Sequence, residues 1–157
     1  MDRTSTSIAF ALMALVAVGA VVHLASAQQQ ADVRDVDSPY QEEFAYSVGE
    51  TLNPRVAMAG ILWTSVSVAP RRDERIDPDA EIPVEVLLEF DNPTDTTHKL
   101  LVILLLENEA GAQLARIECD TVRTPQGRLK EERQKTRVDG SALLGTEKIY
   151  LFAEIVD

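Results

Sequence analysis

Strict alternation of apolar and polar residues marks the clearest element of the chain, at residues 82–90. A period of two predicts a β-strand with one face in a core and the other in water. The turn-forming run at residues 91–95, Asp-Asn-Pro-Thr-Asp, ends this strand. The residues on its apolar face are Ile82, Val84, Val86, Leu88 and Phe90.

Four further segments have strand-like patterns. Residues 100–106 are apolar throughout, which is typical of a strand covered on both faces. Residues 56–68 predict two short strands with a bend at Gly60. Residues 113–122 predict a strand with Ala115, Ile117, Cys119 and Thr121 on one face. Residues 148–156 predict the last strand. Residues 128–138 are mostly charged and predict either an edge strand or a short helix, and residues 141–145 a compact loop.

These patterns predict an all-β domain over residues 55–157. Six to seven strands separated by turns, without a long helix, indicate an antiparallel immunoglobulin-like β-sandwich. The chain has one cysteine, so the disulfide of immunoglobulin domains cannot form. Trp63 and Ile61 are expected to anchor the core instead.

The order of elements from about residue 81 to 138 carries a family resemblance. An alternating strand, an Asn-containing turn, an apolar strand and the hairpin Glu107-Asn108-Glu109-Ala110-Gly111 follow one another. This order resembles bacterial exported sandwich domains of the fibronectin type III or FxLYD kind, although Leu104-Leu105-Leu106-Glu107 replaces the aromatic-rich tetrapeptide of FxLYD. The resemblance implies extracytoplasmic adhesion, scaffolding or interaction, and no catalytic residue.

The segment before the domain divides in two. Residues 1–27 have a polar start, an uncharged apolar run over 8–22 and an Ala25-Ser26-Ala27 end, as a cleaved secretory signal has. The alternative is an uncleaved signal anchor, the one route by which we expect membrane contact. Residues 28–54 predict an acidic linker or arm, since six acids oppose one base between 28 and 53, a net charge of −5. Tyr40, Phe44 and Tyr46 are its candidate contacts with the domain.

Charge narrows the choice of partners. The net charge of −11 argues against a nucleic-acid binder. Between residues 123 and 137, however, six bases oppose two acids, a net charge of +4. Either these bases protect an edge strand from aggregation, or they form an interaction strip for the acidic arm or for an acidic partner. The strip consists of Arg123, Arg128, Lys130, Arg133, Lys135 and Arg137.

The chain offers little for catalysis or metal binding. After export His98 is the sole histidine, and we expect it at an exposed turn. Cys119 is expected to be a buried thiol, with an exposed cysteine that pairs between chains as the alternative. The acidic loops at 77–81 and 91–95 offer calcium ligands but lie at opposite ends of one strand. We therefore predict no catalytic residue, no cofactor and no metal site.

These inferences predict an exported, non-enzymatic module of the periplasm or extracellular space. We expect it to mediate protein–protein interaction or assembly in the cell envelope, with a protein partner or with copies of itself. Strand addition at a sheet edge is the expected mode, with residues 28–54 or 148–156 as donor. The alternatives are a calcium-binding module, a small hydrolase, or a carbohydrate-binding module that uses exposed Trp63, Tyr46 or Tyr150.

Overall fold

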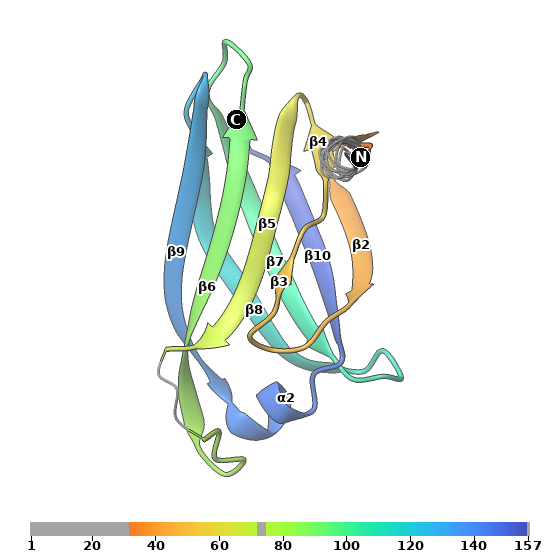
Figure 1. Ribbon diagram of the computed structural model, residues 1–157, viewed down its shortest axis with the longest axis vertical. Helices are drawn as coiled ribbons and strands as arrows, with labels where there is room; N and C mark the ends of the chain where they lie inside the picture. Colours follow the sequence, from red (N-terminus) through yellow and green to blue (C-terminus); the bar gives the residue numbers. More distant parts are fainter. Residues whose placement is uncertain (1–31, 72–74, 157) are drawn as a thin grey trace, which may run out of the picture. The chain divides into compact units, whose positions relative to one another are not determined.

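The computed structural model describes residues 32–71 and 75–156, which form ten strands and one short helix (Figure 1). The compact unit begins at Val33. The strands make two sheets that face each other, so the prediction of an all-β sandwich is confirmed. The predicted signal, residues 1–27, lies outside the described residues.

The first sheet, sheet A, has six strands. Their order is β1-β4-β5-β6-β9, with β3 also paired to β5. Every pair is antiparallel except β1 and β4, which run parallel. The strands are β1 (Arg34–Val36), β3 (Thr51–Leu52), β4 (Val56–Met58), β5 (Ile61–Pro70), β6 (Glu81–Asn92) and β9 (Arg128–Asp139).

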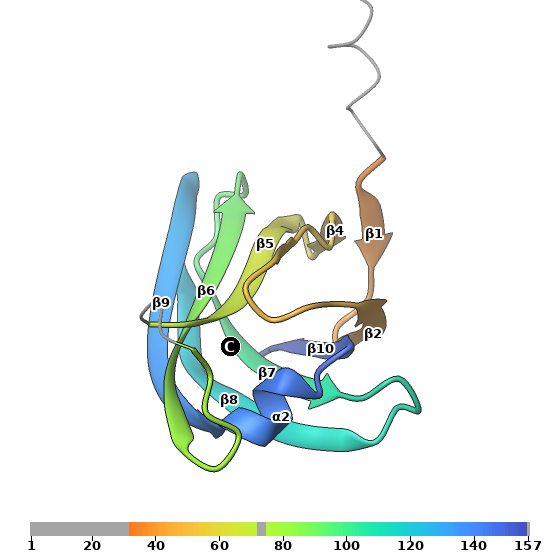
Figure 2. The same cartoon turned by 60° about the horizontal axis from the view of Figure 1, so that its bottom comes forward.

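The second sheet, sheet B, has four antiparallel strands in the order β2-β10-β7-β8. Figure 2 shows the two sheets as separate layers. Strand β10 lies inside sheet B, between β2 and β7, so its backbone is paired on both sides. The strands are β2 (Tyr40–Ala45), β7 (His98–Glu107), β8 (Gln113–Thr124) and β10 (Lys148–Ile155).

The core forms between the sheets from alternate residues of each strand. Val84, Val86 and Leu88 of β6 are fully buried, as the period of two requires. The predicted anchor Trp63 is 3% exposed. Its ring packs on Phe90 with centroids 5.3 Å apart, and its indole N–H donates to the carbonyl of Ser65. Among the described residues, every buried side-chain nitrogen or oxygen has a hydrogen-bond partner.

The segment predicted as an acidic linker or arm differs from expectation. From Arg34 onward it supplies strands to both sheets: β1 and β3 to sheet A, and β2 to sheet B. Tyr40 and Tyr46 are buried, and their contacts offset the cost of ordering this acidic stretch. The predicted strand donors, 28–54 and 148–156, are thus largely paired within the chain. Strand β1 also lies at the edge of sheet A opposite β9, the strand that carries most of the basic strip.

Three local predictions have distinct outcomes. Residues 128–139 are an edge strand and not a helix. In β8 the register shifts between its partners Leu100 and Val102, so Val122 is buried and Thr121, predicted to face inward, is exposed. The predicted loop at 141–145 contains helix α2 (Gly140–Leu144) at one end of the sandwich (Figure 1). None of the described helical residues form a helix long and apolar enough to cross a membrane.

Candidate interaction surface

The outer face of sheet A is a charged surface built by strands β6 and β9. Both strands are regular over this region and present every second side chain outward. Strand β6 contributes Glu85 and Glu89, and β9 contributes Glu131, Arg133 and Lys135. The register places Lys135 directly beside Glu85, so cations of one strand neighbour acids of the next.

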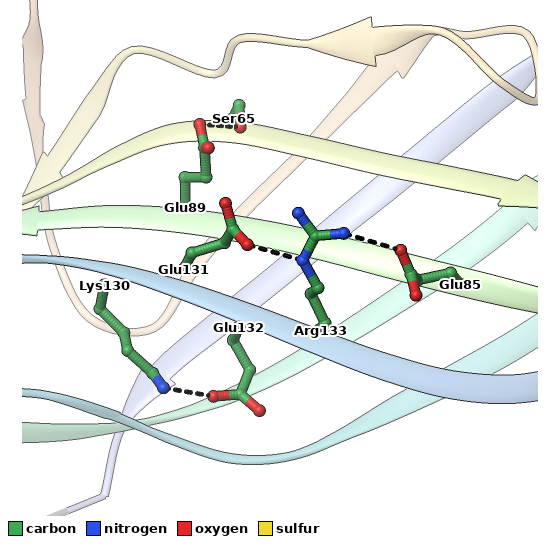
Figure 3. A network of polar contacts seen from close by, with 7 residues as sticks. All are labelled: Ser65, Glu85, Glu89, Lys130, Glu131, Glu132 and Arg133. Carbon is green, nitrogen blue, oxygen red and sulfur yellow. Dashed lines mark hydrogen bonds and ion pairs between the residues drawn. The ribbon is translucent and has the colours of Figure 1, made fainter.

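Arg133 is the centre of the polar network on this face (Figure 3). Its Nη1 lies 3.2 Å from Glu85 Oε1, and its Nε lies 2.6 Å from Glu131 Oε1. The hydrogen bond and charge of Glu131 raise the pKa of Arg133, which stays a cation. Its side chain is 54% exposed, so these ion pairs orient the groups and add little to folding stability.

A second contact relieves a like-charge pair in the same network. Glu89 lies beside Glu131 in the register, which by itself is unfavourable. The hydroxyl of Ser65 donates to Glu89 Oε2 at 2.6 Å, while Glu131 binds Arg133 (Figure 3). Each carboxylate therefore has its own donor, and both are held in place on the surface.

The six residues of the predicted basic strip do not form one surface. Arg133, Lys135 and Arg137 share the outer face of sheet A, where Arg137 contacts Glu81. By alternation Lys130 lies on the other face of β9, in an ion pair of 2.8 Å with Glu132. Arg128 begins β9 on that same side, and Arg123 belongs to β8 of sheet B. The sequence pattern missed this division because consecutive residues of a strand face opposite ways.

A hollow of about 290 Å³ lies in the outer face of sheet A. It opens where β5 presents the small side chains of Ser67 and Ala69 beside the larger Leu87 of β6. Sequence reasoning missed this site because the small residues belong to a strand predicted only for its core face. The lining residues are Ser67, Ala69, Pro70, Arg71, Glu85, Leu87 and Lys135.

Only some of the charged residues that line this hollow are in ion pairs. Glu85, the carboxylate among its described lining residues, is already bound to Arg133. Within residues 32–71 and 75–156, neither Arg71 nor Lys135 has an ion pair. Two cations beside an occupied carboxylate can bind an incoming anionic group, a carboxylate above all.

The residues considered for other chemistry are separated or buried. Cys119 is 4% exposed, and burial raises its pKa to about 12, so the prediction of a buried thiol is confirmed. Trp63 and Tyr46 are each 3% exposed and present no sugar-stacking platform. His98, expected at an exposed turn, is half-buried at the start of β7. In the part of the chain that the structure describes, no three His, Cys, Asp or Glu residues are grouped to hold a metal ion.

Comparison with known proteins finds no family model and no curated protein that matches this chain. The charged face carries acids held by ion pairs, a hollow, and two cations, Arg71 and Lys135, that have no ion pair among the described residues.

Proposed function

We propose that this chain is an exported, non-enzymatic, immunoglobulin-like module that binds a protein partner in the cell envelope. Export is inferred from the signal-like residues 1–27, and the fold subclass from the order of elements at 81–138. The partner contact is assigned to the hollow of sheet A. An acidic segment of the partner places a carboxylate between Arg71 and Lys135.

The uncompensated pair Arg71 and Lys135 carries this proposal. Two other bases on this face are matched to acids of the same chain, Arg133 to Glu85 and Arg137 to Glu81. These two line a hollow without such a match among the described residues. A binding mode through the face of the sheet also agrees with β10 being paired on both sides, which removes it as a strand donor.

Affinity capture with matched variants tests the proposal. The exported protein is used as bait on extracts of its own envelope, and captured proteins are quantified by mass spectrometry. We expect one protein to be retained by the natural chain and depleted at least about tenfold by the double change Arg71→Glu and Lys135→Glu. Arg123→Glu, which reverses a base on the other sheet, serves as the control and retains the partner. A partner retained equally by all three baits contradicts the assigned surface.

A further inference from the structure

The outer face of sheet B carries apolar side chains on its two central strands. Strand β7 contributes Ile103 and Leu105, and β10 contributes Tyr150 and Phe152. All four are half-buried, yet none belongs to the core between the sheets or packs against it. The register pairs Phe152 with Ile103 and Tyr150 with Leu105, so the four form one continuous patch.

No described element covers this patch. Residues 32–71 and 75–156 form the two sheets and α2, and α2 contacts β9 of sheet A. The sequence at 100–106 has the pattern of a strand covered on both faces, whereas the structure covers one. An apolar sheet face with a polar border is typical of an interaction site.

Polar residues flank the patch in a self-complementary order. One row across the sheet reads Glu43 on β2, Tyr150, Leu105 and then Arg116 on β8. An acid thus lies at one end of the row and a base at the other. Glu43 is ion-paired with Lys148 at 2.9 Å and Arg116 with Glu118 at 2.7 Å, but their side chains are 44% and 46% exposed, so both can also reach a charge of a partner.

The adjacent row has the same design. It reads Gln41 on β2, Phe152, Ile103 and Glu118 on β8. The amide of Gln41 can donate to a carboxylate, so this row also has complementary ends around an apolar centre.

We propose that a second copy of this chain covers the outer face of sheet B. A two-fold axis parallel to the strands, between β7 and β10, places β2 of one copy over β8 of the other. Glu43 then faces Arg116 of the second copy at both ends of the row, and the apolar patches meet at the centre. Sheets that pack face to face differ by about 30° in strand direction, an offset that long Glu and Arg side chains can span.

The size of the face sets the strength of this dimer. Four strands about 4.8 Å apart and about eight residues long give roughly 500 Å² per copy. That lies near the lower limit for a specific interface, so we expect a dissociation constant in the micromolar range. This inference concerns another face than the hollow of sheet A and does not rest on the proposed function.

Sedimentation analysis of the exported protein over about 1–200 μM tests whether the chain forms a dimer through this patch. We expect a reversible dimer that Leu105→Glu converts to a monomer. Leu129→Glu is the matched control, because Leu129 is 66% exposed on β9 of sheet A, and this variant stays dimeric. Urea unfolding of both variants verifies that they fold. A protein that stays monomeric at every concentration overturns the proposal, and this is the result expected if residues before Asp32 covered the patch. A dimer that survives Leu105→Glu also overturns it.

Charge reversal tests the orientation of the two copies. Glu43→Arg and Arg116→Glu each place like charges across the interface, so each variant alone dimerises more weakly. In an equal mixture, the changed residue 43 of one variant faces the changed residue 116 of the other, and both pairs become attractive. We expect the mixture to associate at least about tenfold more tightly than either variant alone. A mixture that associates no better overturns the parallel arrangement.

Discussion

The side-chain amide of Gln134 on β9 binds both backbone groups of Asp120 on β8. The N–H of Asp120 donates to Gln134 Oε1 at 3.0 Å, and Gln134 Nε2 donates to the carbonyl of Asp120 at 3.3 Å. Strands β8 and β9 are edges of different sheets, and no backbone ladder joins them. One side chain thus takes the place of a peptide group and links the two layers of the sandwich.

Replacing Gln134 with Met should lower the free energy of unfolding by about 1 kcal/mol, because both hydrogen bonds are lost while length is kept. Urea denaturation measures the change. Lys135→Met is the control, since its side chain has no ion pair among the described residues, and it should stay within about 0.5 kcal/mol. Equal effects of the two changes would show that the link to Asp120 adds no stability.

The buried hydroxyl of Tyr46 predicts a larger loss. It accepts the N–H of Val68 at 2.7 Å and donates toward the carbonyl of Glu50 at 3.0 Å. Tyr46→Phe leaves the Val68 N–H buried without a partner, so unfolding free energy should fall by about 2 kcal/mol. Tyr150→Phe is matched in chemistry but removes an exposed bond to Gln41. Thermal unfolding should find it within about 0.5 kcal/mol of the natural chain, and a similar loss for both variants contradicts this account.

Asn92 is the polar residue on which the turn after β6 depends. It is fully buried; its amide nitrogen donates to the carbonyls of Thr96 and Thr124, and its oxygen accepts from Thr94. Asn92→Asp keeps the shape but points a carboxylate at two carbonyls, so we expect a loss of about 3 kcal/mol or more.

Asn108→Asp is the control for this change. The oxygen of Asn108 accepts the N–H of Ala112 at an exposed hairpin, and a carboxylate accepts equally well. Denaturation should find this variant within about 0.5 kcal/mol of the natural chain. An equally mild Asn92→Asp would mean that water enters the turn and replaces the lost donors.

Cys119 should resist thiol reagents in the folded protein. Burial, with smaller contributions from Asp120 and Glu132, raises its pKa to about 12, so the thiolate is scarce at neutral pH. We expect labelling only after unfolding. A Cys119→Ala chain with Glu118→Cys moves the thiol to the exposed neighbouring position and should react while folded. Fast labelling of the natural folded chain would indicate that β8 opens.

The local pattern of apolar and polar residues predicts much of the fold. The alternation at residues 82–90 and the apolar run at 100–106 correspond to β6 and β7, because a strand with a buried face must repeat every second residue. Trp63 was identified as a core residue by its apolar neighbours. The acidic stretch at 34–52 escaped prediction, since β1, β2 and β3 are short and gain their stability from partners far along the chain.

The charged surface separates what the sequence determines from what only the tertiary structure determines. Composition and spacing by themselves determined that the chain is all-β, acidic overall and locally basic between 123 and 137. Only the tertiary structure decided which bases are neutralised, because Arg133 meets Glu85 through a pairing 48 residues apart. It also decided that Glu43 and Arg116 flank one apolar patch. Such relations depend on which strands become neighbours, and strand order is set by packing of the whole domain and not by any local pattern.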